Sequence, residues 1–255
     1  MSHHPLLQGV GLTLDVDWAP DCVIDHVAAE LRRSGVPATW FVTHAAAAVE
    51  RLRETPALFE LGIHPNFLPG SSHGATVREV LSHCMRLVPE ARSMRTHSLV
   101  QSSPLLGQVV RETPITVDVS LLLPRHQGLQ PVQMPLAGRT LLRLPFYWED
   151  DIEMAFATPD WTPLRAEHGG SLRILNFHPI HIYLNSTTMG AYQALKAAVP
   201  DLQAATPAQL TPFREQGQGT GWAFRQLVHQ LARSGEAARV GDLADRWLGQ
   251  EDSCC

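Results

Sequence analysis

Short apolar segments with the composition of β-strands alternate with helix-like segments through the first two-thirds of the chain. Because mostly apolar strands are buried on both faces, this alternation predicts a parallel sheet covered by helices, and therefore an α/β fold. The predicted strands are residues 10–16, 38–43, 59–64, 93–97, 115–122, 139–145 and 172–178. The predicted helices are residues 20–33, 45–53, 76–87, 103–111, 189–198 and 222–233, with a last turn at 242–248.

The length of 255 residues suits one large α/β domain or two small ones, since domains average roughly 150 residues. No internal repeat, low-complexity tract or linker-like segment divides the chain. We therefore expect a single domain over residues 1–255, with flexible ends at 1–8 and 249–255. Residues 124–170 are rich in Pro and Gly and poor in helix signals, which predicts an excursion over one face of the fold.

The charge pattern excludes several classes of partner. Charged residues make up 18% of the chain, the net charge is −5 and no basic run exists, so the electrostatic footprint of nucleic-acid or acidic-membrane binding is missing. The N-terminal segment lacks the pattern of a signal peptide. Polar residues interrupt the uncharged stretch 174–195, which argues against a membrane span. We expect a cytoplasmic protein.

Cysteine and histidine usage narrows the chemistry. The four cysteines, at 22, 84, 254 and 255, have no CxxC spacing, which argues against a disulfide framework or a zinc ribbon. Cys254 and Cys255 could be lipidated, but a frayed terminus is the preferred interpretation. The 13 histidines are the one unusual number in the composition, and they favour metal or proton chemistry.

Polar and ionisable side chains gather at the carboxyl ends of the predicted strands. This rim is where barrels and open α/β sheets build their sites, so the placement predicts an enzyme. The residues concerned are Asp15, Asp17, His64, Arg95, His97, Asn176 and His178, while Asp118 lies within the fifth predicted strand.

Asp15 and Asp17 stand in LTLDVDW, one residue apart. Both would face the same side of an extended strand, and two neighbouring carboxylates repel unless a cation or an arginine lies between them. Helix capping by Asp17 or Asp21 is the alternative, but it leaves Asp15 unexplained inside an apolar strand. Asp118 in ITVDVS is likewise costly unless it is paired.

His64 ends an apolar strand in ELGIHPNF. A lone histidine at a strand end is more often structural than a ligand. A zinc site would need three His or carboxylate ligands with one open position, and Asp17 with His64 supplies two. His97, Asn66 and His73 are the candidates for the third.

The order of these residues resembles that of the polysaccharide deacetylases, the NodB-homology superfamily of carbohydrate esterase family 4, and most nearly a WbmS-like, cytoplasmic branch found with surface-polysaccharide biosynthesis. The phrases GVPATWFVT, ELGIHPNF and LNFHPIH carry the resemblance, which covers roughly residues 8 to 185. It implies a distorted (β/α)7-type barrel, a divalent metal that is usually Zn²⁺, and removal of N-acetyl groups from amino sugars.

The resemblance also implies roles for residues. Asp15 would be the general base and Asp17 a metal ligand, in a D-x-D variant of the family's acidic pair. His64 matches the first position of H-x-x-x-H, but Leu68 occupies the fifth position and cannot bind metal. We favour His97 as the missing ligand; it replaces the proline of the family's R-x-P motif.

In the same alignment of motifs, Arg95 would orient Asp15. His178 would be the general acid, oriented by Asp118. The aromatic cluster at 146–148 is either a groove wall or core packing. The expected partner is an N-acetylated sugar, linked to a nucleotide, a lipid or a glycan. Another metal-dependent C–N hydrolase, acting on a formamide or cyclic amide, and an inactive sugar-binding protein are the alternatives.

Overall fold

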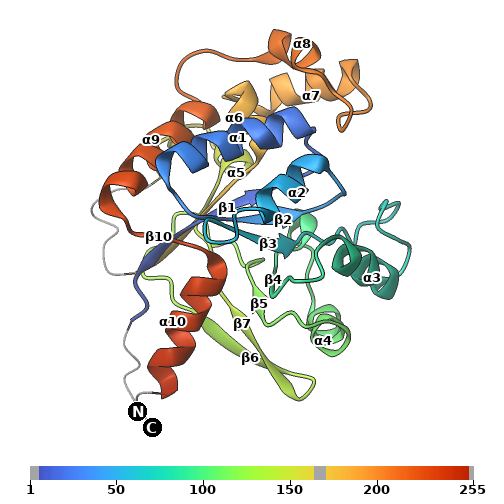
Figure 1. Ribbon diagram of the computed structural model, residues 1–255, viewed down its shortest axis with the longest axis vertical. Coiled ribbons are helices and arrows are strands. Elements are labelled where there is room, and N and C mark those ends of the chain that lie inside the picture. The colour runs from blue at the N-terminus through green and yellow to red at the C-terminus, as the bar shows by residue number, and fades with distance from the viewer. Residues whose placement is uncertain (1–5, 164–170, 253–255) are drawn as a thin grey trace.

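A curled, mostly parallel sheet forms the centre of the molecule (Figure 1). The structure is a computed structural model that describes residues 6–163 and 171–252, with the backbone alone at 250–252. Five parallel strands follow one another in space as they do in sequence: β1 (Gly9–Asp15), β2 (Ala38–Val42), β3 (Phe59–Ile63), β4 (Ser93–Met94) and β5 (Val117–Asp118). On the other side of β1 lie β9 (Leu172–Phe177) and then β8 (Trp148–Glu149). The predicted parallel sheet is confirmed.

The chain between β7 (Arg139–Arg143) and β8 joins the two ends of this sheet. β7 pairs in parallel with β5, and β8 pairs in parallel with β9. Between them, Leu144 N donates to Asp118 O at 2.9 Å and Phe146 N donates to Leu121 O at 3.0 Å. Strands β1 to β5, the continuous β7–β8 segment and β9 therefore form the walls of a distorted barrel, which confirms the expected (β/α)7-type architecture.

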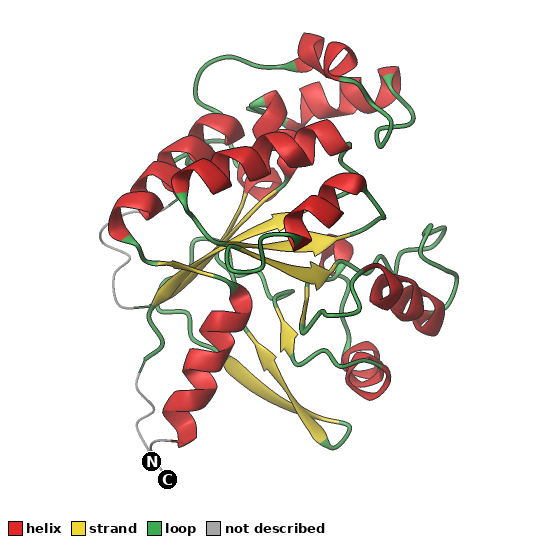
Figure 2. Ribbon diagram, in the orientation of Figure 1, coloured by secondary structure: helices red, strands yellow, loops and turns green. Residues whose placement is uncertain are grey.

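Helices cover the outside of the barrel (Figure 2). Among them is α1 (Asp21–Ser34), which packs an apolar stripe inward and ends at Gly35 in the left-handed region, with φ at 64°. Capping by Asp17 or Asp21 is wrong for this helix, because Pro20 is its N-cap residue without a side-chain bond. The other helices around the barrel include α2 (Ala47–Arg53), α3 (Val77–Leu87), α4 (Ser103–Glu112), α6 (Pro179–Leu184), α7 (Met189–Ala198), α8 (Pro207–Leu210) and α9 (Thr220–Ser234).

The C-terminal helix α10 (Val240–Asp252) closes the amino end of the barrel, opposite α7 and α8 (Figure 1). Its Leu243 side chain is fully buried among the residues of the barrel interior. Gly9 makes room for it: a Cβ there would come within 2.7 Å of Leu243 Cδ2. The short strand β10 (Ala237–Ala238) pairs with β1 and leads into the helix. The sequence predicted only a last helical turn at 242–248 in this segment.

The structure corrects the interpretation of residues 124–170. This region is not simply an excursion, because β7 and β8 belong to the barrel wall and α5 (Asp150–Ala155) follows directly. β6 (Val132–Leu136), antiparallel to β7, extends away from the barrel (Figure 2). The aromatic cluster at 146–148 is buried, and Tyr147 and Trp148 also line a cavity of about 220 Å³, which is separate from the cavity at the carboxyl ends of the strands.

The ends of the described chain are ordered parts of the fold. Leu7 is buried and its backbone N donates to Gln130 Oε1 at 2.7 Å, while α10 continues to Asp252. Cys22 and Cys84 are free thiols, and Cys254 and Cys255 lie outside the described residues. In the described ranges, every helix is too short or too polar to cross a membrane.

Candidate active site at the carboxyl ends of the strands

A cavity of about 300 Å³ opens at the carboxyl ends of the barrel strands. The sequence predicted that polar residues would meet at this rim, and most of them line the cavity. Its walls are Asp15, Asp17, His64, Thr96, His97, Ser98, Leu99, Glu149, Asp151, Ile152 and His178. Asp118 is absent from this lining.

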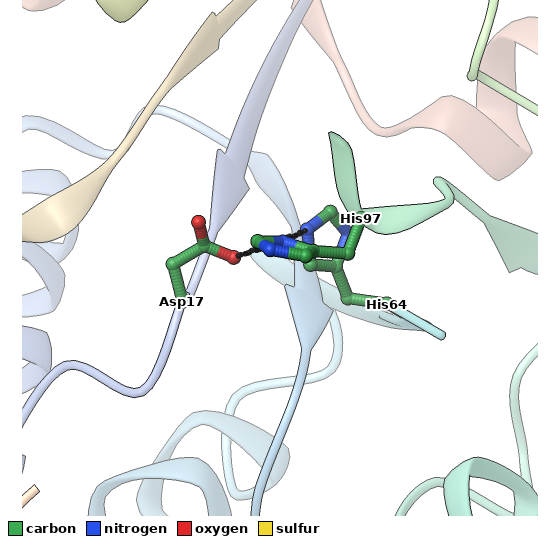
Figure 3. Close-up of side chains that lie close together, drawn as sticks. All are labelled: Asp17, His64 and His97. Carbon is green, nitrogen blue, oxygen red and sulfur yellow. Dashed lines mark hydrogen bonds and ion pairs between the residues drawn. The ribbon is translucent and has the colours of Figure 1, made fainter. Parts of the chain in front are cut away.

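Asp17, His64 and His97 point toward one another (Figure 3). Asp17 Oδ1 lies 3.1 Å from His64 Nε2 and 3.1 Å from His97 Nδ1. The two imidazole nitrogens are themselves 3.4 Å apart. Three ligand atoms from the ends of β1, β3 and β4 thus converge on one point.

The backbone is bent to bring Asp17 to this point. Asp17 and Trp18 both have positive φ angles, of 42° and 55°, in the left-handed region that costs non-glycine residues free energy. Trp18 N donates to Thr43 Oγ1 at 3.1 Å, and Ala19 N donates to Val16 O at 2.9 Å. These two bonds hold the strained turn that follows β1.

The donor set fits a divalent metal. Two imidazole nitrogens and one carboxylate oxygen, with an open cavity beside them, are the ligands that catalytic zinc sites use. Burial raises the pKa of Asp17, but hydrogen bonds from His64 and His97 and the charges of His64 and His178 outweigh burial and hold that pKa well below its usual range. The carboxylate is therefore ionised, as a metal ligand must be.

The other two candidates for the third ligand face elsewhere. Asn66 Oδ1 accepts a hydrogen bond from Leu68 N at 3.0 Å, within its own loop. His73 Nδ1 accepts from Asn66 N at 3.1 Å, and its ring stacks on His83. His73 belongs to none of the groups of metal-ligating His, Cys, Asp and Glu side chains among the described residues.

Asp15 is buried beside this triad and is held by two donors. Arg95 Nη1 donates to Asp15 Oδ1 at 2.9 Å, and Asn176 Nδ2 donates to Asp15 Oδ2 at 2.9 Å. Burial raises the pKa of Asp15. The charge of Arg95, followed by the charges of His64 and His178, lowers it by more than burial raises it, so the net shift is downward. Asp15 is thus an oriented, ionised carboxylate, with Oδ2 3.8 Å from His64 Nε2.

Arg95 is fully buried between two aromatic rings. Its guanidinium carbon lies 4.8 Å from the centroid of Phe41 and 4.3 Å from that of Phe146. It also donates to Thr13 Oγ1 and, through Nε, to Val119 O, both at 2.9 Å. The predicted contact between Arg95 and Asp15 is therefore part of a rigid network inside the barrel.

His178 lies across the cavity from His97 and is held by Asp150. Asp150 Oδ1 is 2.6 Å from His178 Nδ1, and Asp150 Oδ2 accepts from His178 N at 2.9 Å. Burial lowers the pKa of His178, but the charges of Asp150 and Asp151 outweigh burial and raise it well above the usual value. His178 Nε2 faces the triad, 3.7 Å from Asp17 Oδ2.

The expectation that Asp118 orients His178 is wrong. Asp118 accepts from Ser120 Oγ at 2.6 Å and from Arg143 Nε at 2.7 Å, on the barrel wall formed by β5 and β7. Asp150 makes the contact instead because the segment after β8 lies beside β9, whose end carries His178.

Three acidic residues that sequence reasoning missed stand together at 149–151. Glu149 Oε1 accepts from Asn176 Nδ2 at 3.1 Å, and burial followed by the charge of Asp151 raises the pKa of Glu149 to about 8. Burial also raises the pKa of Asp151. The signal in the sequence was the run WEDD directly after an apolar segment, the same strand-end pattern that revealed Asp15 and His64.

The family of the chain follows from comparison with known proteins. The model of the WbmS-like polysaccharide deacetylases matches residues 12–196. The chain belongs to the WbmS-like polysaccharide deacetylase family. This family consists of enzymes that hydrolyse the amide bond of N-acetyl groups. No match was found among curated proteins.

Solved structures agree with this assignment. A putative polysaccharide deacetylase involved in O-antigen biosynthesis in Bordetella bronchiseptica is 30% identical, with a TM-score of 0.77 over 88% of this chain and 91% of that one. A putative polysaccharide deacetylase from Mycobacterium smegmatis is 15% identical, with a TM-score of 0.57 over 98% and 93% of the two chains.

The Xyl-CE4 domain of a multidomain xylanase from the hindgut metagenome of Trinervitermes trinervoides is 13% identical, with a TM-score of 0.50 over 94% and 90% of the two chains. At these lower identities the likeness of the last two structures concerns the barrel alone.

Proposed function

We propose that the protein is a metal-dependent hydrolase that removes an N-acetyl group from an amino sugar or a sugar-containing precursor in surface-polysaccharide biosynthesis. The observation that carries the proposal is the convergence of Asp17, His64 and His97 within 3.4 Å of one another, beside a separate buried carboxylate and a separate histidine. A divalent metal, Zn²⁺ in this proposal, would be held by these three residues.

When bound there, the metal would supply a Lewis acid for the acetyl carbonyl and for a water molecule. The chain's own groups supply the proton transfers. Asp15 accepts the proton of the attacking water, while Arg95 and Asn176 fix its two oxygens. His178 donates a proton to the departing amine, with Asp150 holding its other ring nitrogen.

The two proton-transfer groups suit these opposite tasks. The lowered pKa of Asp15 keeps its carboxylate deprotonated and able to accept a proton, and the raised pKa of His178 keeps its imidazole protonated and able to donate one at neutral pH. Two groups whose environments separate their pKa values are what acid–base catalysis requires. Their contacts with Asp17 and His64 place both within reach of the same cavity.

The relative from Bordetella bronchiseptica, described as involved in O-antigen biosynthesis, supports a surface polysaccharide as the destination of the product. We propose a cytoplasmic location, which favours a nucleotide- or lipid-linked precursor over finished glycan. We also propose that residues 1–255 act as one domain, because α10 completes the barrel core.

The metal content of the purified protein tests the proposal. We expect about one equivalent of zinc in the wild type by elemental analysis, and its loss in both His64→Ala and His97→Ala. Loss in His64→Ala alone would exclude His97 as the third ligand. A wild type that binds no metal even after reconstitution would contradict the hydrolase and favour a sugar-binding protein.

Substrate assays separate the remaining alternative. The zinc-loaded protein should release acetate from N-acetylhexosamine conjugates in preference to formate from formylated analogues. Preferential cleavage of formamides or cyclic amides would instead support another C–N hydrolase on the same barrel.

A further inference from the structure

Four residues form a closed ring of hydrogen bonds that we call the clamp: Gln101, Asp118, Ser120 and Arg143. Asp118 accepts from Ser120 Oγ at 2.6 Å on one oxygen and from Arg143 Nε at 2.7 Å on the other. Arg143 Nη2 donates to Gln101 Oε1. Gln101 Nε2 donates to Ser120 O at 2.9 Å and closes the ring.

The clamp holds the loop 96–101 at both of its ends. At the start, Thr96 N donates to Ser120 Oγ at 2.9 Å, and at the end Gln101 belongs to the clamp itself. The Ser120 hydroxyl donates its proton to Asp118. Its oxygen lone pairs are therefore left to accept the hydrogen bond from Thr96 N. His97 lies inside the loop so held.

This loop is held by different contacts on its two sides. On the side of β3, Arg95 N donates to Ile63 O at 3.1 Å and His97 N donates to Pro65 O at 3.0 Å. On the side of β5, the regular pairing of β4 ends at Met94, and the Ser120 hydroxyl takes the place of a backbone acceptor for Thr96. Immediately beyond His97, Ser98 and Leu99 both have φ at 52°. Two consecutive non-glycine residues in the left-handed region are strained, so this stretch depends on contacts that hold it in place.

We propose that the clamp is a positioning device for the metal site: it fixes loop 96–101 so that His97 presents Nδ1 beside Asp17 and His64. This assigns Asp118 a role in metal affinity in place of the role it was expected to have toward His178. The inference rests on the proposed function, because it takes His97 to be a metal ligand.

The zinc affinity of the metal-stripped, full-length protein tests the clamp, measured by competition with a chromophoric chelator. Ser120→Ala removes the acceptor of Thr96 N, and Gln101→Leu removes the bond that closes the ring at an exposed position where the fold is not at risk. We expect each variant to bind Zn²⁺ about tenfold more weakly, as is typical when the groups that orient metal ligands are removed.

Two matched controls separate positioning from stability. Ser93→Ala removes an equally buried serine hydroxyl of the same sheet, which donates to Glu60 at 2.8 Å near the opposite end of the barrel. Gln108→Leu makes the same change as Gln101→Leu but on helix α4, where Gln108 Nε2 donates to Glu112 Oε1 at 3.1 Å. Both controls should keep wild-type zinc affinity, whatever their melting temperatures.

The Co²⁺-substituted protein supplies a second readout. The visible d–d absorption reports ligand geometry, so Ser120→Ala should change the spectrum and Ser93→Ala should not. Wild-type zinc affinity in both clamp variants, alongside lost affinity in His97→Ala, would overturn the clamp and leave the metal site standing. An equal loss of zinc affinity in Ser93→Ala would also overturn the clamp, because it would show that any loss of stability weakens zinc binding. Wild-type zinc affinity in His97→Ala would overturn both the clamp and the assignment of His97 as a ligand.

Discussion

The carboxylates at the two ends of the barrel have different kinds of partner. At the amino end, Glu60 Oε2 accepts from Thr39 Oγ1 at 3.1 Å and from Gly241 N at 2.7 Å, while its Oε1 accepts from Ser93. Each of its oxygens thus has a neutral donor, and the cavity of about 260 Å³ beside it is lined by Arg92, Arg239 and polar residues of α10. At the carboxyl end, Asp17 faces two imidazole nitrogens across an open cavity.

The difference shows how a carboxylate in a barrel can be recognised as structural or functional. Glu60 is satisfied by hydroxyl and backbone donors that belong to fixed elements, so nothing further is required of it. At the carboxyl end, burial and neighbouring carboxylates raise the pKa values of Glu149 and Asp151, and such shifts cluster at functional sites. Substitutions at the two ends should therefore separate activity from stability.

The largest expected effect is at the carboxyl end. Asp15→Asn preserves the shape of the side chain but removes the base, so kcat/KM for acetate release should fall about 100- to 10,000-fold. Zinc content should stay at the wild-type level, because Asp15 is not among the three converging ligands. Activity within tenfold of wild type would show that another group accepts the proton.

At the amino end, Leu243→Ala should act on stability alone. The side chain is fully buried against the barrel interior, and deleting such a group costs about 2–5 kcal/mol of the free energy of unfolding. Denaturant unfolding measures this loss, and kcat/KM below the melting temperature should be unchanged. A large fall in kcat/KM of the folded variant would show that the two ends are coupled.

Asp150→Asn tests the carboxyl end through the pH dependence of kcat/KM. The charge of Asp150 is the leading opponent of burial in raising the pKa of His178, so its removal lowers that pKa. An acid with a lower pKa loses its proton at lower pH, and the basic limb of the kcat/KM profile should move down by about one pH unit. The acidic limb should stay in place, and an unchanged basic limb would exclude His178 as the general acid.

The smallest effect is expected for Glu60→Gln. The amide keeps one acceptor but loses the negative charge that faces Gly241 N at the start of α10, which should cost about 1 kcal/mol. Chemical denaturation would measure the change, with Gln108→Leu as the surface control. A loss of catalytic rate at 25 °C would contradict the assignment of Glu60 to structure.

The parts of the site that could be predicted from sequence are those placed by strand ends. Asp17, His64 and His97 each follow an apolar strand-like segment, and parallel strands deliver their carboxyl ends to one rim. The pairing of Asp118 with His178 could not be checked in the same way, because which strand ends become neighbours depends on how the sheet closes. The partner of His178 proved to be Asp150, from a region interpreted as an excursion.

The sequence by itself determined the alternation that makes a parallel barrel, the family, and the residues available at the rim, because periodicity and strand-end position are local properties. Only the tertiary structure decided the remaining contacts. The contact of His97 with Asp17, the contact of Asp150 with His178, and α10 as the closure of the amino end all depend on distances between segments far apart in sequence. Such distances follow from sheet closure and packing, which no short stretch of sequence encodes.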